Sequence, residues 1–275
     1  MTAYMEHKDL ANESIDEARA RSIADGVHRV LDDVARAEEQ AGRPAGSVQV
    51  LAASKTRDVG EIMAAVDAGI RLLGENRPQE IVAKIDGLRA QGAQRGLVIG
   101  ASDLETAEGA DDPEALNRLP LHLIGQLQSN KIGKVLPDAD VIESVATLDL
   151  AEKIARRMAV RGRTMGVLIE VNESGEDSKS GIAPDEALDL ALAVAALDGV
   201  EVQGFMTVGA NVDDEATVRA GFAHLRGLRD AALAAGVASA RELSMGMTGD
   251  KEWAIAEGAT IVRIGTGIFG ERDFK

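Results

Sequence analysis

Short apolar runs alternate along the chain with longer segments in which apolar positions recur every three or four residues. An apolar run bounded by glycine, proline or polar residues predicts a buried strand, and the wider spacing predicts an amphipathic helix. The strand pattern occurs eight times, over residues 48–53, 70–73, 119–125, 141–145, 165–171, 202–207, 241–245 and 261–264.

The first helix is predicted over residues 15–41, where Ile23, Val27 and Val34 fall on one face before Gly42 ends the pattern. Each strand except the last is followed by further helix-forming sequence. Seven such helices are predicted, in chain order. They cover residues 59–68, start at residue 78, start at residue 129, end near residue 157, start at residue 184, cover residues 213–235 and end near residue 256.

Eight strands that alternate with helices predict a single α/β domain, a (β/α)8 TIM barrel with the extra N-terminal helix packed outside it. A doubly wound open sheet is the rival fold. The count of eight and the lack of a Gly-rich nucleotide motif after the first strand favour the barrel. We expect residues 1–14 to form a disordered tail, residues 15–275 to form the barrel domain, and residues 92–118 to form an acidic surface insertion.

The amino-acid composition excludes several classes of function. There are 46 acidic and 30 basic side chains, for a net charge of −16, which argues against nucleic-acid and anionic-membrane partners. The chain has no cysteine, so thiolate nucleophiles, disulfides and Cys-based metal sites are excluded, and we expect no metal. No apolar run is long enough to span a membrane, and the polar start is unlike a signal peptide, so we expect a cytoplasmic protein.

Lys55 follows the first strand, and helical sequence begins shortly after it. Parallel strands deliver the residues at their C-terminal ends to the site of an α/β protein. Such a lysine can bind an anion, or its amine can form a Schiff base. The alternative is a solvated lysine at the end of a strand.

Polar and small residues end many of the other strands, and a barrel would bring them to the same mouth. Two glycine-containing segments, residues 244–248 and 264–267, fall at the last two strands, where barrels often bind phosphate. Tight turns are the alternative for both segments. The candidate mouth residues are Asn76, His122, Asn172, Met206, Ser244, Met245, Gly246, Arg263, Gly265 and Thr266, with Lys179 in the polar loop 172–181.

Several of these segments together resemble the pyridoxal phosphate homeostasis protein family. They occur in the family's order and extend over roughly residues 25–272. The matching stretches are Ala53-Ser54-Lys55-Thr56, Gly74-Glu75-Asn76-Arg77 with Gln79-Glu80, 122–131, 171–172, 175–182, 204–206, 243–248 with Asp250, and 262–270.

The resemblance implies a barrel of the alanine racemase N-terminal type that holds pyridoxal 5'-phosphate (PLP) as a Schiff base on Lys55. It implies that Ser244, Gly265 and Thr266 bind the phosphate, and that Arg263 lies near the phosphate or the pyridine nitrogen. Asn76 and Met206 would line the cofactor ring. His122, Asn172, Lys179, Met245 and Gly246 are further possible pocket residues.

Three functions fit such a barrel. Racemisation needs an acid or base on each face of the substrate carbon, and the only tyrosine, Tyr4, lies in the predicted tail. We therefore expect a monomeric PLP carrier in vitamin B6 homeostasis, without strong catalysis, with apo forms of PLP enzymes as possible acceptors. A weak PLP-dependent amino-acid racemase is the alternative, and a Schiff-base aldolase acting on a phosphorylated metabolite is a third reading.

Overall fold

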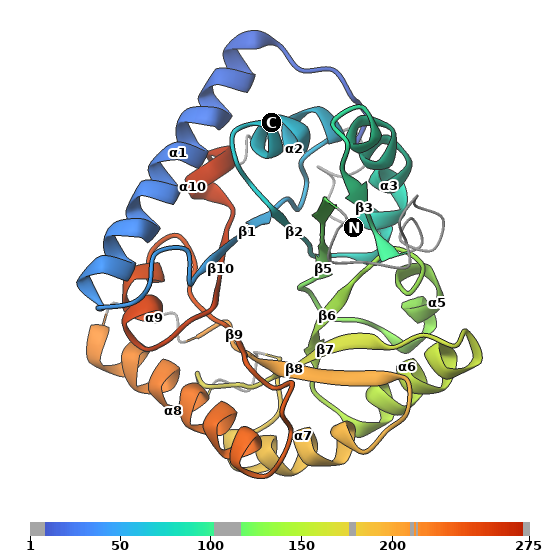
Figure 1. Cartoon of the computed structure of the whole chain (residues 1–275), viewed down its shortest axis with the longest axis vertical. Helices are drawn as coiled ribbons and strands as arrows, with labels where there is room; N and C mark the ends of the chain where they lie inside the picture. Colours follow the sequence, from blue (N-terminus) through green and yellow to red (C-terminus); the bar gives the residue numbers. More distant parts are fainter. Residues whose placement is uncertain (1–8, 102–116, 176–179, 210–211, 213, 272–275) are drawn as a thin grey trace.

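The structure is a computed structural model that describes residues 9–101, 117–175, 180–209, 212 and 214–271. Parallel strands close into a barrel in the order β1-β10-β9-β8-β7-β6-β5-β2 (Figure 1). The eight predicted strands and the TIM barrel are thereby confirmed. The barrel strands are β1 (Gln49–Ala53), β2 (Leu72–Glu75), β5 (Leu121–Leu123), β6 (Val141–Val145), β7 (Met165–Glu170), β8 (Val200–Met206), β9 (Glu242–Ser244) and β10 (Ile261–Ile264).

Helices surround the barrel, and among the described residues none is long and apolar enough to cross a membrane. Short 3-10 turns, η2 (Ser129–Lys131) and η3 (Pro184–Glu186), lead into two of the helices. The helices are α1 (Glu17–Gln40), α2 (Val59–Asp67), α3 (Pro78–Ala93), α5 (Ile132–Val135), α6 (Leu148–Val160), α7 (Ala187–Ala195), α8 (Glu215–Ala234), α9 (Lys251–Ala256) and α10 (Thr266–Phe269).

Local sequence sets where several helices begin. The Asp58 carboxylate accepts a hydrogen bond from the Glu61 N–H, and the Glu61 side chain accepts one from the Asp58 N–H, so α2 starts with a capping box. Pro78 occupies the first turn of α3, where its missing N–H has no cost. Asp16 caps α1 in the same way as Asp58 caps α2.

Helix α1 packs outside the barrel along α2, α9 and α10, as predicted (Figure 1). Its apolar face is buried at Ile23, Val27 and Val34. The approach to α10 is close: a Cβ atom added at Gly26 would lie 2.4 Å from the Ile268 carbonyl oxygen. A glycine is therefore required on this face of the helix.

The predicted tail differs in part from expectation, and the predicted insertion is described only at its ends. Residues 9–14 are not disordered, because the Leu10 carbonyl accepts a hydrogen bond from the Val59 N–H at 3.2 Å and Leu10 is buried. The ends of the predicted insertion 92–118 are also ordered, since β3 (Val98–Ile99) pairs in parallel with β4 (Arg118–Leu119). Residues 1–8 and 102–116 lie outside the described residues.

Two regions bury apolar side chains. The larger one lies between the barrel and its helices and takes every second strand residue, such as Leu73 and Val262. The alternate residues point into the barrel, where they form two small clusters. One cluster is Leu51, Leu72 and Ile261, and the other is Val141, Leu168 and Met206.

Candidate functional site

Lys55 lies at the C-terminal mouth of the barrel, two residues beyond the end of β1. Strand β1 pairs with β10 on one side and β2 on the other, so residues after these three strands become neighbours. Asn76 directly follows β2, and its carbonyl oxygen would lie 2.1 Å from a Cβ atom added at Gly125. The chain segments that follow β2 and β5 are therefore closely packed at the mouth.

A buried polar network crosses the barrel below this mouth. His122 Nδ1 lies 2.7 Å from Glu143 Oε1, and the Ser244 hydroxyl donates a 2.6 Å hydrogen bond to Glu143 Oε2. Arg263 donates to the Ser244 Oγ at 2.7 Å and to the Thr207 carbonyl at 2.7 Å. We call His122, Glu143, Ser244 and Arg263 the interior network.

The Glu143 carboxylate of the interior network is surrounded by the hydrogen bonds and charges of His122, Ser244 and Arg263. Burial raises the pKa of Glu143, but the hydrogen bond and charge of His122, with Arg263 and Ser244, outweigh burial and hold that pKa below its usual value. A carboxylate only accepts hydrogen bonds, so His122 Nδ1 carries the proton between them. Burial lowers the pKa of Arg263, against the charges of Glu143, Asp250 and Glu170.

Sequence analysis missed two carboxylates of the barrel. Glu143 is fully buried, and Glu170 is 3% exposed at the end of β7, where it accepts a hydrogen bond from the Ser180 hydroxyl. Burial raises the pKa of Glu170. The available signal was a single acidic residue inside an apolar strand run, as in Val141-Ile142-Glu143-Ser144-Val145.

The two glycine-containing segments meet at the mouth. Thr248 Oγ1 lies 3.2 Å from Thr266 Oγ1 and accepts a hydrogen bond from the Gly267 N–H at 3.3 Å. Gly246 has a φ of +93°, and a Cβ atom there would lie 2.5 Å from the Ala254 Cβ. Ser244 sits deeper, and its hydroxyl hydrogen is directed to Glu143.

Strand alternation separates the two predicted methionines. Met206 is 1% exposed and packs inside the barrel with Val141 and Leu168. Met245 is fully buried in the large cluster between barrel and helices. The predicted place of Met245 in the pocket is therefore wrong, because it follows Ser244 and so points the other way.

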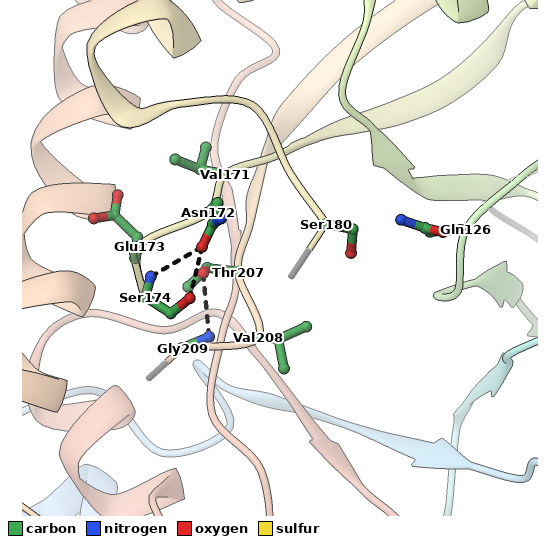
Figure 2. A pocket seen from close by; sticks show the side chains of 9 residues that line it. All are labelled: Gln126, Val171, Asn172, Glu173, Ser174, Ser180, Thr207, Val208 and Gly209. Carbon is green, nitrogen blue, oxygen red and sulfur yellow. Dashed lines mark hydrogen bonds between the residues drawn. The ribbon is translucent and has the colours of Figure 1, made fainter. Parts of the chain in front are cut away.

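A cavity of about 350 Å³ opens beside the interior network, between the ends of β7 and β8. Figure 2 shows Asn172 and Ser174 on one side of it and Gln126 on the other. The Asn172 side-chain oxygen accepts hydrogen bonds from the Ser174 N–H at 3.2 Å and hydroxyl at 2.7 Å. Asn172 thus lines a cavity, and Lys179 lies outside the described residues.

Comparison of this sequence with known proteins shows the family to which the chain belongs. The alanine racemase N-terminal domain family matches residues 31–273. The pyridoxal phosphate homeostasis protein of Vibrio cholerae is 37% identical over 255 residues, which cover 93% of this chain and 98% of that protein. The chain belongs to the pyridoxal phosphate homeostasis protein family. The Aquifex aeolicus protein of the same name is 36% identical over 248 residues, or 90% of this chain and 97% of its own.

Solved structures agree with this assignment to the pyridoxal phosphate homeostasis protein family. A protein of unknown function from Bifidobacterium adolescentis has 62% identity and a TM-score of 0.89, covering 95% of this chain and all of that one. PipY of Synechococcus elongatus, solved with PLP bound, has 30% identity and a TM-score of 0.65, covering 86% of this chain. Alanine racemase of Clostridium difficile, at 14% identity and a TM-score of 0.65, shares the fold.

Proposed function

We propose that this protein binds PLP as a Schiff base on Lys55 and acts in intracellular PLP homeostasis, passing the cofactor to apoenzymes. The observation that carries the proposal is the place of Lys55, whose segment lies at the barrel mouth between β2 and β10 and so next to the paired glycine-containing turns. Family membership and the PLP bound to PipY support it. When bound, PLP supplies an aldehyde that condenses reversibly with amines.

The residues present fit such a cofactor. A phosphate accepts hydrogen bonds, and Gly265 and Thr266 offer an N–H group and a hydroxyl at the turn after β10. Arg263, buried two residues before Gly265, supplies positive charge from below. The Ser244 hydroxyl can donate a hydrogen bond to the phosphate only if its O–H turns away from Glu143. Asn76 and Met206 are the proposed ring-side residues.

The interior network favours a carrier over a racemase. His122 is the candidate for a second proton donor, but its Nδ1 is engaged with Glu143 and the residue is 7% exposed. A group held in this way supports the floor of the site better than it shuttles protons to a substrate. We propose that the protein acts as a cytoplasmic monomer. A weak amino-acid racemase is the second candidate.

Borohydride reduction tests the covalent site. The purified protein is loaded with PLP, reduced and digested, and mass spectrometry locates the phosphopyridoxyl group. We expect it on Lys55, with no stable labelling in Lys55→Ala and wild-type labelling in the surface control Lys153→Ala. A group on another lysine, or none, would contradict the proposal.

Proton exchange separates carrier from racemase. The PLP-loaded protein is mixed with L- or D-alanine in deuterated buffer, and the Cα–H signal is followed by NMR. The carrier predicts exchange no faster than with free PLP. Fast exchange that is lost in Lys55→Ala would establish the racemase instead.

A further inference from the structure

A second buried charged cluster lies behind Lys55, and the proposed function gives its residues no role. Lys84 of α3 is 0% exposed. Its ammonium donates to Glu75 Oε1 at 2.7 Å and lies 3.4 Å from Glu80 Oε2. It also donates to the Ser54 carbonyl at 3.0 Å. We call Lys84, Glu75 and Glu80 the Lys84 cluster.

The Lys84 cluster holds the backbone on both sides of Lys55. On the N-terminal side, Lys84 binds the Ser54 carbonyl, and the Ser54 hydroxyl donates to Glu75 Oε1 at 2.7 Å. On the C-terminal side, the Thr56 N–H donates to Glu80 Oε2 at 2.9 Å. Lys55 is therefore the residue between two anchored neighbours.

The backbone at this point is unusual. Thr56 has a φ of +66°, and it is the only non-glycine residue with positive φ in the described part of the chain. A β-branched residue in this region is strained, and such a conformation persists only where its surroundings enforce it. Thr56 is 8% exposed, and the Glu80 carboxylate binds its N–H. The cluster thus supplies what enforces the strained turn after Lys55.

Stabilisation of the fold does not by itself account for such a buried charged cluster. Taking three charged groups out of water is costly, and well-packed apolar residues of the same volume are often at least as stabilising. The contacts instead go to two specific backbone groups, the Ser54 carbonyl and the Thr56 N–H. Buried charges that bind the backbone beside a reactive lysine are suited to positioning that lysine.

We propose that Lys84, Glu75 and Glu80 are positioning residues. They fix the direction in which the Lys55 amine enters the barrel mouth, and so they set the reactivity of that amine. The inference rests on the proposed function for the identity of the bound carbonyl compound. It assigns no direct contact between Lys84 and that compound.

The main test measures the reactivity of Lys55 without any cofactor. The protein is labelled with acetic anhydride across a pH series, and mass spectrometry compares Lys55 with Lys153. In Lys84→Met, which keeps the length of the side chain and loses its charge, we expect Lys55 reactivity to change about tenfold, within the range for a displaced reactive group. PLP uptake followed by borohydride trapping should slow by a similar factor.

Leu88→Ala is the matched control. Leu88 lies one turn further along α3 and is 1% exposed, so its truncation destabilises the same helix without touching the Lys55 segment. We expect Leu88→Ala to leave Lys55 reactivity unchanged. If Lys84→Met also leaves it unchanged, Lys84 serves the fold only and the inference is wrong.

A pair of Glu80 variants keeps the inference testable even if Lys84→Met does not fold. Glu80→Gln retains an oxygen that can accept from the Thr56 N–H, and Glu80→Leu does not. We expect Glu80→Leu to speed amide hydrogen exchange at Thr56 and alter Lys55 reactivity, and Glu80→Gln to restore both. Equal behaviour of the two variants would overturn the inference.

Failure of the proposed function is a separate result. A wild-type protein that takes up no PLP on Lys55 would contradict the PLP proposal. The labelling and exchange comparisons use no PLP, so they would still decide whether the Lys84 cluster positions Lys55.

Discussion

Glu143 and Glu75 are both fully buried, yet their pKa values move in opposite directions. In the interior network, His122 and Arg263 provide positive charge and hydrogen bonds around one carboxylate, and the pKa of Glu143 falls. In the Lys84 cluster, burial outweighs the attraction of Lys84, the nearby Glu80 adds repulsion, and the pKa of Glu75 rises to about 7. Burial raises both pKa values, and the hydrogen bonds and charges around each carboxylate decide the sign of the net shift.

The two networks also differ in how the chain assembles them. The interior network joins β5, β6, β9 and β10, so it requires the closed barrel. The Lys84 cluster uses residues 75–84 of a single strand–helix unit and binds the adjacent turn after β1. One network fixes the floor of the site, and the other fixes the approach of Lys55.

The largest effect should come from breaking the interior network. Glu143→Leu leaves Arg263 and His122 buried without their carboxylate, so we expect a loss of about 3 to 5 kcal/mol in the free energy of unfolding. Urea unfolding followed by circular dichroism measures it. Glu143→Gln keeps the shape and part of the hydrogen bonding and should lose less; equal losses would show that charge is unimportant here.

A smaller loss is expected in the Lys84 cluster. Lys84→Met leaves Glu75 and Glu80 buried without their cation, so we expect a loss of about 2 to 3 kcal/mol in the same urea assay. Adding Glu75→Leu removes one of the stranded acids and should recover part of that loss. A double variant less stable than the sum of the two single variants would contradict this account.

The pH dependence of stability distinguishes the two networks directly. Because the pKa of Glu75 is raised to about 7 in the folded state from an ordinary 4.5, the folded protein holds more protons between these values. The contribution of Glu75 to stability is therefore complete below about pH 4.5 and is lost as the pH rises through 7. Relative to Glu75→Gln, the wild type should lose about 2 kcal/mol between pH 5 and 8. A constant difference across urea titrations at these pH values would refute the assignment.

The smallest loss in the free energy of unfolding is expected when an exposed ion pair is removed. Lys153 and Asp149 are 2.6 Å apart on α6, with side chains 38% and 69% exposed. Solvent screens such a pair, so Lys153→Ala should change the free energy of unfolding by no more than about 0.5 kcal/mol. A loss comparable to that of Lys84→Met would mean that burial is not what distinguishes the two lysines.

Much of the fold was predictable because its signals are local. Apolar periodicity located all eight barrel strands and α1, and Pro78 marked where α3 begins. The position of Lys55 at a strand end, and the glycine-containing turns after β9 and β10, were likewise visible in the chain. These features depend on neighbours in sequence, so the sequence by itself determined them.

Tertiary structure decided what the side chains meet. Closure of the barrel brought Glu143 between His122 and Ser244, from strands far apart in the chain. Strand alternation turned Met245 away from the site into the outer core, and packing against α2 ordered residues 9–14. The charges of the Lys84 cluster became a buried unit only when α3 packed onto β1 and β2. Burial and partner geometry are properties of the assembled barrel, and they set the direction of each pKa shift.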